Sequence, residues 1–393
     1  MLLTEQKQER WIEINLDAII ANIKEIRSHI ESSCRLLAVV KADAYGLGSV
    51  QIAKALVDEV DMLAVSTCEE GIELRQNGIE TPILVFIPPS PYTAELMLRY
   101  HLTASIDSTE SLDLLIACGA NNHPCHLKIN SGMNRLGISL AQAAYLAQKI
   151  TATSALCLTG IYSHLALAAD RISANRQIGN FKKALSSIED LGIDYGVAHI
   201  ANSTAIIKLP ESHLDMVRAG TIIYGQSPVA LPNGWHLENP WQANCRIIAV
   251  RELKKGDAVG YGGDFIAHKD MQIAIIPFGY ADGFALETNT RSGSIGAIFR
   301  QSLKNVARIV SQRPLHYAFY DNDNTHLKLP IVGRVGMQLS AVDITGYPIK
   351  KDDILQLSLR RTCTNSRISR IYYKDQQIIH QRNMLNLETD ITT

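Results

Sequence analysis

Short apolar runs rich in β-branched residues recur along the first 220 residues of the chain, and helix-like stretches separate most of them. Continuous apolar runs are typical of strands that are covered on both faces, as in parallel sheets. Eight such strands alternating with helices over about 200 residues predict a (β/α)8 TIM barrel. The expected strands are residues 36–42, 62–67, 82–87, 102–107, 126–130, 158–165, 197–202 and 214–220.

Four stretches in the same region carry the signals of helices. Residues 16–30 are expected to form a first helix ahead of the first barrel strand. Residues 108–118 open with a capping box, in which a serine or threonine is followed closely by an acidic residue. Apolar residues recur at helical spacing in residues 139–150 and 177–192, and the second stretch ends on a glycine.

After about residue 240 the pattern changes to strands without long helices between them, which indicates a separate, mainly β domain. We therefore predict a barrel over residues 13–240 and a β domain over residues 241–393, on which residues 1–12 can pack. The polar stretch 286–327 is expected to form a long loop or hairpin. The strands expected in this domain are residues 245–253, 272–283, 306–311 and 329–344.

The composition limits the partners and the compartment. The formal net charge of −1 gives no electrostatic signal for nucleic acid or an anionic membrane, and no run of 18 apolar residues predicts a membrane span. The seven cysteines include no CxxC pair, which favours reduced thiols over a disulfide framework or a metal site. Residues 1–15 carry charges where a signal peptide needs an apolar core, so we expect a cytoplasmic protein without a metal.

Lys41 ends the first expected barrel strand, directly after an unbroken apolar run. Most lysines at strand ends pack their stem and extend the ammonium group into water. The carboxyl ends of barrel strands, however, carry the active site in TIM-barrel enzymes. A partly desolvated lysine there can act as a nucleophile or bind a carbonyl group covalently, because its pKa is lowered.

The run AVVKADAYGLG, residues 38–48, resembles the cofactor-lysine motif of the alanine racemases, a fold type III family that depends on pyridoxal 5′-phosphate (PLP). Further motifs of that family follow in its order and spacing, and together they cover residues 10–345. These motifs are HLKINSGMNRLGI (126–138), SHLALAAD (163–170), AHIANSTA (198–205), LDMVRAGTIIYG (214–225), VGYGGDF (259–265), IPFGYADG (276–283) and GRVGM (333–337).

The resemblance implies a PLP site. Lys41 would bind PLP covalently, and Tyr45 would hydrogen-bond its phosphate. Arg218 would donate to the pyridine nitrogen, which keeps the ring a weak electron sink and favours racemisation. Without the resemblance, an arginine at this position is interpreted as part of a surface ion pair with Asp215. Taken alone, the run NST in AHIANSTA reads only as a helix cap. The remaining cofactor residues that the resemblance implies are His164, Asn202, Ser203, Gly220, Thr221 and Ile222.

Racemisation needs two bases on opposite faces of the substrate Cα, and the resemblance implies Lys41 and Tyr261 of the partner subunit. A homodimer with shared active sites follows. His164 would neighbour the tyrosine and connect to Arg218 and His199, although two histidines at strand ends are as often satisfied core residues.

The substrate carboxylate would be bound by the Arg135 side chain and the Met337 backbone N–H, again by resemblance. Lys128 matches a lysine that is carbamylated in many members of the family and that positions the arginine. The chain departs from the usual pattern at Leu47, Asn130, Ala219, Gly336 and Gln338.

A segment that carries a further phosphate-binding tyrosine in the family is missing between Asp343 and residues 366–373. The expected function is the interconversion of L-alanine and D-alanine, a small amino-acid substrate, for cell-wall synthesis. Two alternatives stay open because the departures surround the substrate entrance: a racemase of serine, lysine or several amino acids, and a weakly active PLP-binding protein.

Overall fold

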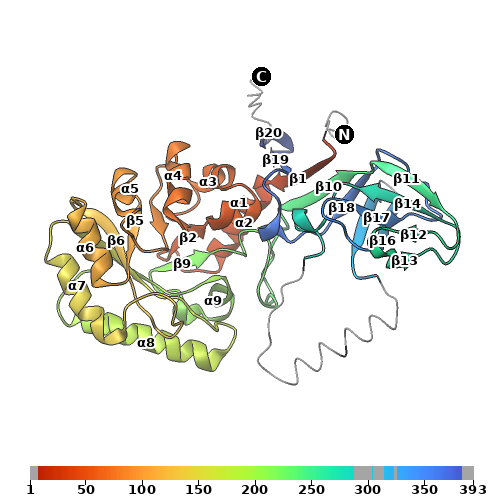
Figure 1. Ribbon diagram of the computed structural model, residues 1–393. Helices are drawn as coiled ribbons and strands as arrows, with labels where there is room; N and C mark the ends of the chain where they lie inside the picture. The colour runs from red at the N-terminus through yellow and green to blue at the C-terminus, as the bar shows by residue number, and fades with distance from the viewer. Residues whose placement is uncertain (1–7, 287–302, 304–313, 323–324, 383–393) are drawn as a thin grey trace. The chain divides into compact units, whose positions relative to one another are not determined.

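The computed structural model in Figure 1 describes residues 8–286, 303, 314–322 and 325–382. The chain divides into two units. One is Asn15–Pro240, and the other consists of the described residues within Met1–Ile14 and Trp241–Thr393. Within the described ranges no helix has the length and apolar character needed to cross a bilayer.

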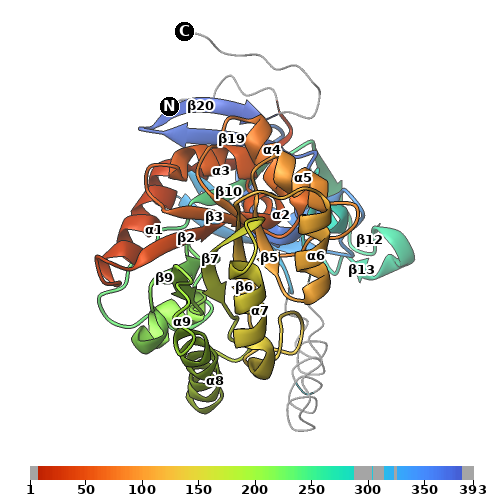
Figure 2. The same cartoon turned by 90° about the vertical axis from the view of Figure 1, so that its left-hand side faces the viewer.

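The unit Asn15–Pro240 is an eight-stranded parallel barrel with helices around it (Figure 2), which confirms the predicted (β/α)8 fold. The strands follow the order β8-β7-β6-β5-β4-β3-β2-β9. Two backbone bonds bring β8 and β9 together: Asp215 N–H donates to Ala198 C=O (3.2 Å) and Arg218 N–H donates to Ala201 C=O (3.0 Å). The strands are β2 (Arg35–Val39), β3 (Met62–Val65), β4 (Ile83–Val85), β5 (Thr103–Ile106), β6 (His123–Lys128), β7 (Leu156–Tyr162), β8 (Val197–His199) and β9 (Met216–Ala219).

Five of the eight helices listed below begin at side-chain caps that the sequence supplies. Asn15 accepts from two N–H groups of the first helix, and Asp170 accepts from Ser173 N–H at the start of the longest. The expected capping box at Ser108 is present, but its reciprocal partner is Ser111 instead of an acidic residue. The helices are α1 (Leu16–Ser28), α3 (Ser49–Leu56), α4 (Cys68–Gln76), α5 (Ala94–Arg99), α6 (Thr109–Ala117), α7 (Ala143–Thr151), α8 (Arg171–Glu189) and α9 (Ser203–Lys208).

The short segment α2 (Lys41–Gly46), directly after β2, is a left-handed turn. Residues 42–45 have φ between 50° and 57° and ψ between 33° and 52°. Non-glycine residues in this conformation cost roughly 1–2 kcal/mol each, so other contacts must hold the turn. Ala44 N–H closes it by donating to Val40 C=O at 2.9 Å.

The second unit is built on one ten-stranded sheet in the order β11-β14-β17-β16-β15-β18-β10-β1-β19-β20, with β12 and β13 as a separate pair. Its described ladders are antiparallel, which confirms a mainly β domain. The strands are β1 (Arg10–Asn15), β10 (Trp241–Arg246), β11 (Ala249–Leu253), β12 (Ala258–Val259), β13 (Phe265–Ile266), β14 (Met271–Ile276), β15 (Tyr317–Asn322), β16 (Thr325–Val332), β17 (Ser340–Asp343), β18 (Ile354–Leu357), β19 (Ser369–Lys374) and β20 (Gln377–Arg382).

Several expected strands of this unit differ in extent. The run 245–253 is divided between β10 and β11, which pair with different strands. The run 329–344 is divided between β16 and β17, because Gly333 adopts a φ of 69° and the chain turns there. The stretch 286–327 contains β15, which pairs with β16, and the expected strand 306–311 lies outside the described residues.

Candidate active site

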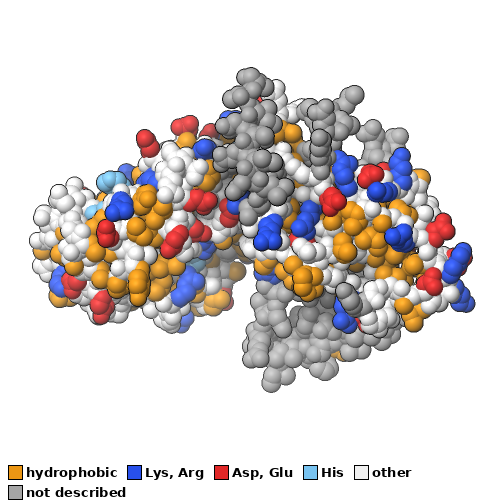
Figure 3. All heavy atoms as spheres, turned by 45° about the horizontal axis from the view of Figure 1, so that its top comes forward, with side chains coloured by type: hydrophobic (Ala, Val, Ile, Leu, Met, Phe, Trp, Pro, Cys, Tyr) orange, Lys and Arg blue, Asp and Glu red, His pale blue; other side chains and the backbone are white. Residues whose placement is uncertain are grey.

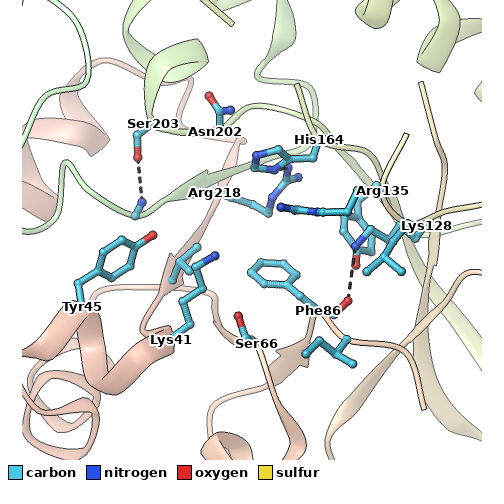
Figure 4. Close-up of a pocket in the computed structure, with 15 residues that line it drawn as sticks. Lys41, Tyr45, Ser66, Phe86, Lys128, Arg135, His164, Asn202, Ser203 and Arg218 are labelled. Atoms are coloured by element: carbon cyan, nitrogen blue, oxygen red, sulfur yellow. Dashed lines mark hydrogen bonds between the residues drawn. The ribbon is translucent and has the colours of Figure 1, made fainter. Parts of the chain in front are cut away.

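A pocket of about 310 Å³ lies at the carboxyl ends of the barrel strands (Figure 4). This is the end at which TIM barrels carry their active sites. Figure 4 shows the Lys41 amine, the Tyr45 hydroxyl and the Arg135 guanidinium turned toward the same space. The lining residues are Val39, Lys41, Tyr45, Ser66, Phe86, Ile87, Lys128, Arg135, Leu136, Tyr162, His164, Asn202, Ser203, Arg218 and Gly220.

Lys41 lies one residue beyond Val40, where the buried run of β2 ends, and its side chain is half-buried. Burial lowers the pKa of its ammonium group, and the positive charge of Arg135 lowers it further. The nearby Glu70 carboxylate acts in the opposite direction and raises the pKa. The net shift favours the neutral amine, which is the nucleophilic form.

Arg218, on β9, is 3% exposed and forms a buried hydrogen-bond centre. Its Nη1 contacts His199 Nδ1 at 2.9 Å and donates to His199 C=O at 3.1 Å. Its Nη2 donates to Ser163 C=O (2.6 Å) and Ile200 C=O (3.2 Å), and lies 3.4 Å from His164 Nδ1. Among the described residues, Nε–H is the one donor of this guanidinium without a protein acceptor, and Arg218 lines the pocket.

A second histidine continues this chain into the barrel interior. Because the guanidinium can only donate, His199 Nδ1 accepts and His199 Nε2 carries the proton. His199 Nε2 therefore donates to His126 Nδ1, 2.9 Å away. His126 was not among the residues predicted for the site. Its position two residues before Lys128 on the same strand, with the same inward direction, was the available signal.

Tyr162, at the end of β7, connects several of these groups and was also not predicted. Its ring stacks on His199 at 5.1 Å, and its hydroxyl donates to Ser105 Oγ at 2.7 Å, since Ser105 itself donates to Val85 C=O. The Lys128 ammonium lies 5.2 Å from the ring centroid. Lys128 is 6% exposed, and burial together with nearby arginines lowers its pKa to about 8.

The opposite end of the pocket offers small neutral donors. Gly220 N–H donates to Ser203 Oγ at 3.0 Å, which ties the end of β9 to the start of α9. A Cβ on Gly220 would lie 2.6 Å from the Tyr45 hydroxyl, so a larger residue there would displace that hydroxyl. Asn202 caps α9 by accepting from Ala205 N–H, as predicted when the run NST is interpreted as a helix cap.

These side chains fit PLP. None of the described residues that line the pocket is acidic, whereas four of them, Lys41, Lys128, Arg135 and Arg218, are basic. Phosphate and carboxylate anions are therefore favoured, and the hydroxyls of Tyr45 and Ser203, which line the pocket beside Gly220, can donate to a phosphate. The donor Nε–H of Arg218 suits a ring nitrogen that accepts.

The predicted site residues divide between the two units. The barrel brings together the predicted cofactor and carboxylate residues that line the pocket, with His199 behind Arg218. Thr221 and Ile222 follow Gly220 directly on the chain. Met337, 60% exposed, and Tyr261, at the start of a 3-10 turn between β12 and β13, belong to the β unit.

The buried histidines make a prediction about pH. Burial lowers the pKa of each of the three histidines, and the positive charge of Arg218 lowers it further. The pKa falls to about 3 for His164 and for His126. The pKa of His199 lies well below its usual range. An unfolded histidine titrates at about 6.5. As the pH falls below that value, the unfolded chain takes up protons that the folded chain does not, so stability is lost progressively down to about pH 3.

We expect the free energy of unfolding in urea to fall between pH 7.5 and 5.5, with each neutral histidine contributing up to about 1.4 kcal/mol per pH unit at the acidic end. His126→Gln should make this dependence shallower, whereas His268→Gln, at an exposed position, should leave it unchanged. Equal slopes in wild type and His126→Gln would show that His126 is not held neutral.

Comparisons with known proteins identify similar chains. The family model "Alanine racemase, N-terminal domain" matches residues 14–228, and "Alanine racemase, C-terminal domain" matches residues 241–311. An alanine racemase of Desulfovibrio desulfuricans is 31% identical over 345 residues, which cover 86% of this chain and 85% of the relative. One of Nostoc sp. is 36% identical over 286 residues, 70% and 74% of the two chains. A solved alanine racemase of Clostridium difficile 630 has a TM-score of 0.83 at 26% identity, covering 97% of this chain and 100% of its own.

Proposed function

The chain belongs to the alanine racemase family, and from this premise we propose that it interconverts L-alanine and D-alanine with PLP by a two-base mechanism. The observation that carries the proposal is that Lys41, Arg218 and the group Tyr45, Ser203 and Gly220 line one pocket at the carboxyl end of the barrel. In this pocket, a lysine with a lowered pKa lies together with a buried guanidinium and with hydrogen-bond donors that can bind an anion.

Lys41 would hold the cofactor and then act as the base on one face of the substrate Cα. Bound PLP supplies an electron sink that makes the α-hydrogen of an amino acid acidic. The lowered pKa of Lys41 increases the share of neutral amine, which is the form that can take up that proton. Arg218 Nε–H is free to donate to the ring nitrogen, which keeps that nitrogen unprotonated.

Tyr261 of the partner subunit would act as the base on the other face. The hydrogen-bonded series His164–Arg218–His199–His126 supports a fixed orientation for the histidine that would neighbour it. Each of these three histidines has a lowered pKa, so the series is uncharged apart from the guanidinium. A shared site of this kind requires a homodimer.

The substrate carboxylate would be bound by Arg135 and by the Met337 N–H, and Lys128 would orient Arg135. The positive potential of the pocket supports binding of such an anion. On the face of the molecule that Figure 3 shows, basic and acidic side chains are interspersed. A small-molecule substrate does not require a surface of a single charge. We place the activity in the cytoplasm, where it would supply D-alanine for cell-wall synthesis.

Mixing two inactive variants tests the shared site. Lys41→Ala and Tyr261→Phe homodimers each lack one base at both sites. After subunit exchange, half of the dimers are mixed and each mixed dimer has one intact site, so about a quarter of wild-type activity should return. Mass spectrometry of differently tagged subunits measures the exchange. Complete exchange without any recovered activity would contradict a site shared between subunits.

A further inference from the structure

The turn that carries Lys41 needs an external support. Residues 42–45 are left-handed, and the amide of Ala42 takes no part in the closing bond of the turn, which joins Ala44 N–H to Val40 C=O. Lys41 and Tyr45, at the two ends of this turn, both line the pocket. A change in the turn would therefore move both side chains at once.

Glu70, on α4, supplies that support. Its Oε1 accepts from Ala42 N–H at 2.5 Å, directly after Lys41 in the chain. Its Oε2 accepts from Ser66 N–H at 2.7 Å and from Thr67 N–H at 3.1 Å. One carboxylate thus joins the strained turn after β2 to the end of β3 and the start of α4, with each oxygen serving one side.

The same carboxylate contributes negative charge near the lysine. The charged and titratable groups that act on Lys41 are Glu70, Arg135, Lys128 and His164. Lys128 and Arg135 are cations, and His164 is neutral because its pKa is lowered to about 3. Among the described residues, these four are the groups whose charge acts on Lys41 or that are themselves affected by the charge of Lys41. Glu70 is the one acidic group of the four.

We propose that Glu70 is a positioning residue of the active site: its two oxygens hold the left-handed turn so that Lys41 and Tyr45 converge on the cofactor, and its carboxylate supplies negative charge near the Lys41 amine. This inference rests on the proposed function, because it concerns the lysine that would bind PLP. A simpler role as the capping-box residue of α4 explains only the bonds to Oε2. It leaves the bond from Ala42 unexplained.

The experiment compares Glu70→Gln with two matched controls. A glutamine side chain has one acceptor oxygen instead of two and no charge, so it cannot serve both sides. Glu69→Gln removes a neighbouring exposed carboxylate of the same helix. Thr67→Ala removes the hydroxyl that accepts from Glu70 N–H, and so weakens the α4 cap without removing the contact to the turn.

Two measurements on the apo-proteins separate positioning from capping. The first is hydrogen exchange of the peptide that contains Ala42, which should become roughly tenfold faster in Glu70→Gln alone, since a charge-assisted bond is lost. The second is the pH midpoint for acylation of Lys41 by a small amine reagent, followed by peptide mapping. Removing the negative charge should lower this midpoint by up to about one unit in Glu70→Gln and leave it unchanged in both controls.

Each outcome supports or overturns the proposal. Unchanged exchange at Ala42 in a folded Glu70→Gln protein would contradict the positioning role, and an unchanged midpoint would contradict the electrostatic one. Equal effects in Thr67→Ala would reduce Glu70 to a helix cap. The proposed function is tested separately by borohydride reduction of wild-type protein with PLP: an adduct on Lys41 supports it, and an adduct only on other lysines overturns it whatever Glu70 does.

Discussion

The Lys41→Ala protein is expected to lose racemisation in both directions, by at least about 10⁴-fold, the upper end of the effect of a lost general base. The loss should be this large because the same amine would hold PLP covalently. The yellow colour expected of the wild-type protein with PLP should disappear too. Activity is measured from each enantiomer of alanine by circular dichroism.

The matched control for this prediction is Lys54→Ala, which removes an exposed lysine of α3 and should change neither activity nor colour. Far-ultraviolet circular dichroism establishes that both variants are folded. A folded Lys41→Ala protein that keeps wild-type colour would show that another residue binds the cofactor.

Arg218→Met is expected to lower the free energy of unfolding by about 3 kcal/mol, in addition to weakening PLP binding. Two opposing effects decide the sign. Methionine removes the cost of burying a guanidinium that has no carboxylate partner in the described part of the chain. It leaves the carbonyls of Ser163, His199 and Ile200 without that donor. Ser163 and Ile200 are almost completely buried, so water cannot replace the lost bonds cheaply.

Urea unfolding of the purified protein measures this effect at fixed concentration and pH. Arg171→Met is the control, because Arg171 is 73% exposed in its ion pair with Glu211 and should contribute less than about 0.5 kcal/mol. A stability of Arg218→Met equal to that of wild type would show that the cost of burying the charge balances its hydrogen bonds. The centre would then serve the reaction and not the fold.

The barrel could be predicted from the sequence because its signal is repeated. Most of the eight strands are short apolar runs, and several of the helices between them begin at side-chain caps. Lys41 could be singled out for the same reason, since a charge interrupts an apolar run at the point where a barrel strand ends. The β unit was harder, because antiparallel strands that belong to different ladders follow one another without a helix.

Other features of the site depend on contacts that a linear pattern does not contain. The left-handed turn at residues 42–45 is formed by a sequence with two alanines, which favour ordinary helices, and it is supported by Glu70 from another element. Tyr162 carries no distinguishing neighbour in the sequence, and its role follows from His199 stacking on its ring. The inward direction of His126 could be predicted from the alternation of side chains along β6. Its hydrogen bond to His199 could not be predicted in this way.

The most direct test of the central claim is circular dichroism of the purified protein with PLP and L-alanine as the only amino acid. The proposed function predicts that the ellipticity of alanine decays to zero as the two enantiomers reach equal concentrations, and that D-alanine gives the mirror-image decay. L-serine and L-lysine, tested in parallel, should decay more slowly. A constant signal with L-alanine, from protein that carries PLP on Lys41, would contradict alanine racemisation, and faster decay with serine or lysine would assign the activity to that substrate.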